Sequence, residues 1–329
     1  MINLKKIYFF FFLIIINYFL FTAIIFSFSY ISLINGKTYN WFWVKSIQKK
    51  IYFDGLRNIW QFNKNCATFD KDLLYKPIIG QCSFNNPEFQ TELNFKKYNR
   101  SHGNKVNFNK GDIVILGDSI AMGWGVNDNE TFSYHLEKGL KKNVYNLAVS
   151  SYGTVREIKR YKLSPFFDNS DTLIIQYHPN DLGENKELNI NKSYLSTDFE
   201  KFFQHSHKNK LILILGTFKS SLRLFFSDII DIAFKEKNME IIDFNEHRIY
   251  LEKILRANIN LKKKRLIVFL TINPWQKIIN FPQEKNEIEY LLIQLKKEDY
   301  FTIDDHPNAK GHKQLSDYLT KYLISNRNK

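Results

Sequence analysis

Residues 112–126 read DIVILGDSIAMGWGV and give the strongest indication of the fold. Four branched apolar residues, 113–116, end at Gly117-Asp118-Ser119, and helix-compatible residues follow. Such a run bounded by a glycine turn predicts a buried strand of a parallel sheet. A polar side chain at the carboxyl end of that strand, here Ser119, faces the ligand crevice of an open α/β sheet. Gly-Asp-Ser also forms ordinary turns and helix caps, so its meaning depends on the rest of the chain.

Strands and helices alternate from residue 110 onward. The predicted strands are 112–116, 143–148, 172–177, 210–215 and 265–270, with helices such as 131–141 and 155–163 between them and an amphipathic helix at 313–325. Alternation of this kind predicts βαβ units and a parallel sheet covered on both faces. Residues 239–244 form a further strand or belong to an insertion at 183–260, which has no assignment.

The composition bounds the class of protein. A chain of 329 residues with 44% hydrophobic residues holds one large α/β domain and an appendage. The net charge of +14 invites a nucleic-acid interpretation, but the lysines are scattered and no nucleic-acid-binding motif is present. We therefore expect no nucleic-acid partner, and the basic charge instead favours an acidic polysaccharide or an anionic membrane surface. The oligomeric state is not predicted.

An apolar N-terminal run predicts a membrane anchor. Residues 7–34 contain no charged side chain and exceed the roughly 20 residues that a helix needs to cross a bilayer. A cleaved signal peptide is the alternative, since Lys5 and Lys6 precede the run. The run is too long for one, and Ser-Leu-Ile-Asn-Gly is a poor cleavage site. We expect a tail at 1–6 and an uncleaved transmembrane helix at 7–34.

Charge and cysteine usage disagree about topology. Lys5 and Lys6 favour a cytoplasmic N-terminus, but four lysines between residues 37 and 50 flank the other end. Cys66 and Cys82 would close a short disulfide loop, which persists only in an oxidising compartment; two unpaired thiols are the alternative. We favour a body outside the cytoplasm, periplasmic or extracellular.

Residues 35–109 form a juxtamembrane region rich in aromatic residues and asparagine. Trp41, Trp43 and Tyr52 suit a membrane interface or the core of a small cap. The polar stretch 99–105 connects this region to the main domain, 110–329.

Two further predicted strands end in polar turns. Residues 143–154, NVYNLAVSSYGT, run into a small-residue turn, where a backbone N–H can approach a substrate oxygen. After the strand at 172–177, the Asn180 amide can donate to a developing oxyanion, while Asp181 caps the next helix. His178 precedes a proline and is interpreted as structural.

Residues 301–312, FTIDDHPNAKGH, place acid and imidazole together before the last helix. A serine hydroxyl needs a base to take its proton, and a carboxylate must hold that imidazole in the right tautomer. The alternative is that Asp304 or Asp305 only caps the helix. Other histidines show no metal-ligand spacing, and His312 is expected to face outward.

Taken together, the four segments resemble the SGNH/GDSL hydrolase superfamily over about residues 110–325. The resemblance implies a flavodoxin-like three-layer α/β/α sandwich with a central parallel sheet, no metal and no cofactor. It implies ester hydrolysis or acyl transfer through an acyl-serine. In the site that it implies, Ser119 is the nucleophile, His306 is the base and Asp304 is the acid. The oxyanion donors that it implies are Ser119, Ser151, Gly153 and Asn180.

Three departures from the family pattern matter. Ser151 replaces the usual glycine, with Gly153 two residues on, and His178 replaces the glycine of the third motif. The acid usually stands three residues before the histidine, where this chain has Ile303. Asp304 is the preferred acid, because Asp305 is adjacent to His306 and would point away.

Three hypotheses about function follow. The preferred one is a membrane-anchored esterase that removes acetyl groups from a cell-surface or exported glycan. The second is an O-acetyltransferase that uses the same site, because the outcome depends on whether water or a sugar hydroxyl reaches the acyl-serine. The third is a non-catalytic scaffold module in envelope assembly. The two enzymatic hypotheses require that the Ser119 hydroxyl lie within hydrogen-bond reach of the His306 imidazole.

Overall fold

The structure, a computed structural model, describes residues 4–101, 111–187, 190–207, 210–234, 239–282 and 287–326. Its centre is a five-stranded sheet in the order β11-β9-β7-β5-β6, with every neighbouring pair parallel. Counted within the sheet alone, this is the flavodoxin-like order 2-1-3-4-5 of a doubly wound fold. The strands are β5 (Ile113–Gly117), β6 (Val144–Asn146), β7 (Thr172–Gln176), β9 (Arg265–Ile272) and β11 (Ile288–Gln294).

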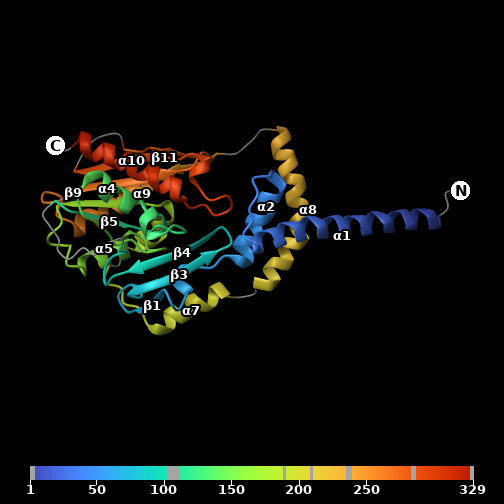
Figure 1. Cartoon of the computed structure of the whole chain (residues 1–329), viewed down its shortest axis with the longest axis horizontal. Coiled ribbons are helices and arrows are strands. Elements are labelled where there is room, and N and C mark those ends of the chain that lie inside the picture. The colour runs from blue at the N-terminus through green and yellow to red at the C-terminus, as the bar shows by residue number, and fades with distance from the viewer. Residues whose placement is uncertain are drawn as a thin grey trace.

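Helices cover both faces of this sheet, as Figure 1 shows. Side chains alternate along β5, so that Ile113 and Ile115 join one hydrophobic core and Val114 and Leu116 the other. The first core is closed by α4 (Phe132–Leu140) and α10 (Ala309–Ser325), and the second by α5 (Thr154–Lys162) and α9 (Phe244–Asn258). The predicted three-layer α/β/α sandwich is confirmed.

One predicted strand is wrong, and one strand of the central sheet was missed. Residues 210–215 are not a strand but the start of α8 (Lys210–Phe234), because a short continuous apolar run fits a buried helix as well as a buried strand. The edge position of the sheet belongs to β11, whose middle residues are only partly buried. The stretch 239–244 contains β8 (Glu240–Asp243), which pairs with β10 (Gln276–Ile279) in a small separate sheet.

The N-terminal segment packs onto the main body. After α1 (Leu4–Ile34) and α2 (Phe42–Ile51), it forms two antiparallel hairpins whose aromatic side chains enter the same core as α4 and α10. Cys66 and Cys82 are joined by a disulfide between these hairpins. The hairpin strands are β1 (Ala67–Asp70), β2 (Leu74–Pro77), β3 (Gly80–Asn86) and β4 (Phe89–Phe95). The connection predicted at 99–105 falls largely on residues 102–105, which lie outside the described residues.

Figure 1 shows α1 projecting from the body as one long helix, with α8 lying across it. Residues Ile7–Ile34 are long and apolar enough to cross a membrane, and they make up the one such segment within the described residues. The remaining helices are α3 (Ser119–Met122), α6 (Leu182–Glu187), α7 (Ser196–His207), and the short helices η1 (Tyr52–Leu56), η2 (Trp60–Phe62), η3 (Asp128–Glu130), η4 (Pro179–Asp181) and η5 (Lys297–Asp299).

Candidate active site

Ser119 lies at the carboxyl end of β5, next to the point where the strand order reverses. β5 ends at Gly117, whose φ of +148° belongs to a region that favours glycine, and a Cβ there would lie 2.6 Å from the Ala121 side chain. Asp118 then caps α3 by accepting a hydrogen bond from the Ile120 N–H at 2.9 Å. This turn places Ser119 as the first residue of α3, nearly buried, at the edge of the sheet where ligands bind in doubly wound folds.

The structure brings Ser119 and His306 together from opposite ends of the main domain. The Ser119 Oγ lies 2.8 Å from Nε2 of His306, and Nδ1 of His306 is hydrogen-bonded to Oδ1 of Asp304. The indole of Trp124 stacks on the imidazole, with the ring centres 4.9 Å apart and the planes 19° from parallel. Hydroxyl, imidazole and carboxylate therefore form a continuous chain of hydrogen bonds, with the ring held by the indole.

The second oxygen of Asp304 is also fully engaged. Oδ2 accepts hydrogen bonds from the Tyr52 hydroxyl at 2.5 Å and from the Trp124 indole N–H at 3.2 Å. Burial by itself would raise the pKa of this carboxyl, but His306, Arg57 and the Tyr52 hydroxyl together hold the pKa well below its usual range. Asp304 is therefore ionised at neutral pH.

Tyr52 remains a hydrogen-bond donor in this arrangement. Burial raises the pKa of its phenol, and the negative charge of Asp304 raises it further. The Arg57 guanidinium lies 3.6 Å from Asp304 Oδ2 and 4.8 Å from the centre of the Trp124 ring. Two residues of the segment after α1, Tyr52 and Arg57, thus complete the surroundings of the acid.

Asp305 lies apart from this chain of hydrogen bonds. Its exposed carboxylate pairs with Lys49 of α2 at 2.7 Å. The structure therefore distinguishes the two adjacent acids, and Asp304, the one preferred from the sequence, is the one that contacts His306.

Glu88, in the turn between β3 and β4, fixes the loop that carries the acid and the base. Its carboxylate accepts the backbone N–H groups of Thr302 at 2.7 Å, Ile303 at 2.9 Å and Asp304 at 2.7 Å. Burial raises the pKa of Glu88, while these three hydrogen bonds act in the opposite direction. The loop is therefore held by a residue more than 200 positions earlier in the chain, in a hairpin that the sequence pattern does not connect with the site.

Candidate oxyanion donors surround Ser119 at the ends of three neighbouring strands. Ser119 and Ser151 have no hydrogen-bond acceptor for their backbone N–H groups among the described residues. Ser151 has a φ of +61°, which explains why glycine is usual at this position, and its carbonyl accepts from Arg156 at 2.5 Å. Asn180, after β7, is exposed and borders the same pocket.

Gly153 does not belong to this group, so the sequence-based assignment of Gly153 as a donor is corrected. Its N–H donates to Glu184 at 3.1 Å, and a Cβ at this position would lie 2.8 Å from the Glu184 side chain. The packing of α6 against this turn explains the need for glycine here, and the Gly153 N–H is already paired with Glu184 of α6.

A pocket of about 320 Å³ opens beside Ser119 and His306. Polar and aromatic side chains from the N-terminal segment and from the main domain share its wall. It is lined by Phe53, Arg57, Ile59, Gln61, Asp118, Ser119, Ile120, Trp124, Ser150, Ser151, His178, Asn180, Asp305 and His306. His178 lies at its rim, where its Nδ1 accepts the Asn180 N–H at 3.3 Å.

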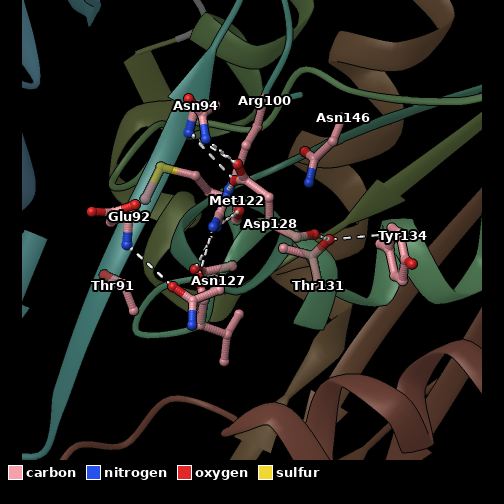
Figure 2. Close-up of polar contacts among 12 residues, drawn as sticks. Thr91, Glu92, Asn94, Arg100, Met122, Asn127, Asp128, Thr131, Tyr134 and Asn146 are labelled. Carbon is pink, nitrogen blue, oxygen red and sulfur yellow. Dashed lines mark hydrogen bonds and ion pairs between the residues drawn. The ribbon is translucent and has the colours of Figure 1, made fainter. Parts of the chain in front are cut away.

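A buried arginine holds the turn that follows α3. The Arg100 guanidinium donates to the carbonyls of Met122 at 2.8 Å, Gly123 at 2.7 Å and Val126 at 2.7 Å, and it pairs with Asp128 at 2.7 Å. Figure 2 shows Arg100 beside Met122 and Asp128, with Asn94 reaching the same carboxylate from β4. The predicted connection at 99–105 therefore contributes a structural anchor for the loop that carries Ser119 and Trp124.

His312 departs from its expected outward position. Its ring is buried against Phe132 and accepts the Phe132 N–H at 3.2 Å, and burial lowers its pKa to about 3. In the part of the chain that the structure describes, no group of three or more His, Cys, Asp or Glu side chains is arranged to hold a metal ion.

The sequence matches no protein-family model and no curated protein. Similar solved structures include a member of the lipolytic protein G-D-S-L family from Veillonella parvula (12% identity, TM-score 0.28, covering 66% of this chain and 100% of that one). Another is a family two carbohydrate esterase from Clostridium thermocellum in complex with cellohexaose (11%, 0.35, 69% and 66%). A third is an acetyl xylan esterase from Butyrivibrio proteoclasticus (13%, 0.31, 67% and 65%).

Because these identities and TM-scores are low, the function of this chain is inferred from the geometry of its own site. The strand order gives this chain a flavodoxin-like α/β/α fold, and residues from all four sequence motifs line one pocket.

Proposed function

We propose that this protein is a membrane-anchored serine esterase that acts through an acyl-serine intermediate. The observation that carries the proposal is the chain of hydrogen bonds from Ser119 through His306 to Asp304, at the wall of an open pocket. A serine hydroxyl becomes an effective nucleophile when an imidazole within hydrogen-bond reach takes its proton and a buried carboxylate stabilises the imidazolium.

The proposed reaction has two stages. The Ser119 Oγ attacks the ester carbonyl while His306 takes the hydroxyl proton, and the carbonyl oxygen becomes an oxyanion beside the N–H groups of Ser119 and Ser151 and the amide of Asn180. The carbon–oxygen bond to the alcohol then breaks, and His306 returns the proton to the leaving alcohol. Water repeats the sequence on the acyl-serine and releases the acid.

The proposed substrate is a short acyl ester, such as an acetyl group, on a cell-surface or exported glycan. The pocket volume of about 320 Å³ suits a small acyl group with part of a sugar. Its wall combines amide, hydroxyl and carboxylate groups with the aromatic rings of Phe53 and Trp124, a mixture that suits hydroxyl-rich ligands.

The proposed location is the outer side of a membrane, with α1 as the anchor and the N-terminus inside. The Cys66–Cys82 disulfide supports an oxidising compartment for the body. The apolar segment Ile7–Ile34, of which the first half projects away from the body, supports the anchor.

An active-site serine probe tests the proposal on the full chain in detergent. We expect a fluorophosphonate to label the wild type, not to label Ser119→Ala, and to label His306→Ala far more slowly, because the base activates the hydroxyl. Ser150→Ala, a neighbouring serine at the pocket wall, is the matched control and should label like the wild type. Equal labelling of wild type and Ser119→Ala would refute the proposal.

Hydrolysis of p-nitrophenyl acetate, with and without an oligosaccharide acceptor, separates the esterase from the transferase. We expect acetate release without an acceptor. Acetyl transfer to the sugar with no hydrolysis in its absence would replace the esterase by the O-acetyltransferase. If the fluorophosphonate does not label the wild type and the wild type does not consume p-nitrophenyl acetate with or without the acceptor, the scaffold interpretation remains.

A further inference from the structure

Helix α8 lies outside the α/β/α body and packs on the anchor. Phe225 of α8 contacts Phe21 of α1 and Trp43, with ring centres 5.4 and 5.7 Å apart, and Phe218 contacts Phe26 of α1 at 5.3 Å. Figure 1 shows α8 running across α1, on the side of the body from which α1 projects. If α1 crosses a bilayer, α8 therefore runs along its surface.

The burial pattern of α1 places the surface of that bilayer at α8. Residues 7–21 are exposed apart from Ile16, which is half-buried, and burial against the rest of the protein begins at Thr22 and Ile25. α8 contacts α1 at Phe21 and Phe26, and from Ile7 to these two residues an α-helix extends about 21 and 29 Å, the second close to the thickness of the hydrocarbon core. The remainder of α1 then lies above the hydrocarbon, packed on α2 and α8.

The face of α8 that points away from the body combines apolar and cationic side chains. Ile212, Leu215 and Phe226 are 63%, 59% and 52% exposed, and the exposed Lys219 and Arg223 lie between them at helical spacing. The polar residues Thr217 and Ser221 face the other way and are buried. Residues 212–226 contain no acidic side chain.

The exposed side of α8 is unusual for a helix in water, because it carries isoleucine, leucine and phenylalanine in addition to the apolar side chains that pack on α1. It suits the boundary of a bilayer, where apolar side chains enter the acyl region and lysine and arginine extend to phosphate groups. Trp41 gives the same indication near this end of α1, since it is 58% exposed and stacks with Phe28.

We propose that the exposed face of α8, defined by Ile212, Leu215, Lys219, Arg223 and Phe226, binds the surface of a bilayer that contains anionic phospholipid. The proposal rests on the membrane anchor of the proposed function and adds a second contact with the membrane. A single helix would let the body rotate and tilt. Two crossed helices fix the height and the direction of the pocket relative to the bilayer.

Depth-dependent quenching on the reconstituted full chain tests the proposal. Because Cys66 and Cys82 are paired, Leu215→Cys and Phe226→Cys each introduce a single site for a fluorescent label. In phosphatidylcholine–phosphatidylglycerol vesicles, we expect lipids spin-labelled near the headgroup to quench both labels several-fold more strongly than a label at Lys138→Cys. Lys138 is an exposed residue of α4, on the body.

Phe12→Cys, in the exposed part of α1, separates the two proposals. If the label at residue 12 is quenched by deeply spin-labelled lipid while those at 215 and 226 behave like that at 138, the α8 proposal is overturned and the anchor stands. If residue 12 is not quenched either, both fail. Lys219→Glu combined with Arg223→Glu should reduce quenching at residue 215 in the anionic vesicles.

A second copy of the chain is the competing occupant of this face. If a second copy covers α8, the fluorescence of a label at residue 215 will depend on the number of protein molecules per vesicle, and spin-labelled lipid will not quench it. That result would overturn the proposal.

Discussion

Replacing Tyr52 by phenylalanine removes one oxygen atom from the buried surroundings of Asp304. That hydroxyl donates to Asp304 Oδ2 at 2.5 Å, and a hydrogen bond to a charged group contributes about 1.5–3 kcal/mol. Trp124 and Arg57 stay near the same oxygen, at 3.2 and 3.6 Å, so we expect the lower end of that range. A loss of about 1.4 kcal/mol in transition-state stabilisation lowers kcat/KM about tenfold.

The pH dependence of the same variant has a definite sign. The hydroxyl favours the ionised carboxylate, so its removal should raise the pKa of Asp304 toward its ordinary value, 3.8. A depressed pKa in the folded protein stabilises the fold above the unfolded pKa, and that contribution is lost as the pH falls toward the folded value. The difference in stability between wild type and Tyr52→Phe should therefore be full at pH 7 and shrink below about pH 4.

The assay is kcat/KM for p-nitrophenyl acetate, with thermal unfolding of the same detergent-solubilised samples at several pH values. Tyr318→Phe is the matched control, because its side chain is 54% exposed on α10 and no hydrogen bond of its hydroxyl occurs within the described residues. If Tyr52→Phe keeps kcat/KM within about twofold and the unfolding free energy within about 0.5 kcal/mol of the wild type, the Tyr52 hydroxyl does not support Asp304.

Three further predictions concern other parts of the site and its support. Asp304→Asn should lower kcat at least about 100-fold while Asp305→Asn stays within about twofold, and equal loss in both would contradict the assignment of the acid. Arg100→Met should destabilise the protein by about 3–5 kcal/mol in chemical denaturation, since it leaves Asp128 and three carbonyls without their buried partner; a change below about 1 kcal/mol would argue against this role. Under identical reducing conditions, Cys66→Ser and the wild type should have the same free energy of unfolding. Both should be less stable than the oxidised wild type by about 3 kcal/mol, because the disulfide closes a loop that spans 16 residues. Equal stability of the oxidised and reduced wild type would contradict a structural disulfide.

The local sequence determined those features that depend on a few neighbouring residues. The apolar run before Gly117-Asp118-Ser119 favours a buried strand because a glycine turn bounds it, and that turn contains the small residue and the capping carboxylate that it needs. Asp304 and His306 share one short loop, so their contact needs little more than that loop. Strands separated by helices imply a parallel sheet, and parallel strands align their carboxyl ends. The pairing of Ser119 with His306 follows from that alignment, which only folding could realise.

Other features of the site depend on which distant segments of the chain come together, and only the tertiary structure shows this. Tyr52 and Glu88 carry no pattern of their own, and each becomes part of the site because η1 and the β3–β4 hairpin pack over the last loop. The run at 210–215 is helical because it is continuous with the rest of α8, which packs on α1 and α2. Asp304 and Asp305 are chemically identical neighbours, and only their surroundings separate a buried acid on His306 from an exposed partner of Lys49. Burial and hydrogen bonding across the chain are properties of the assembled core, so no local pattern could contain them.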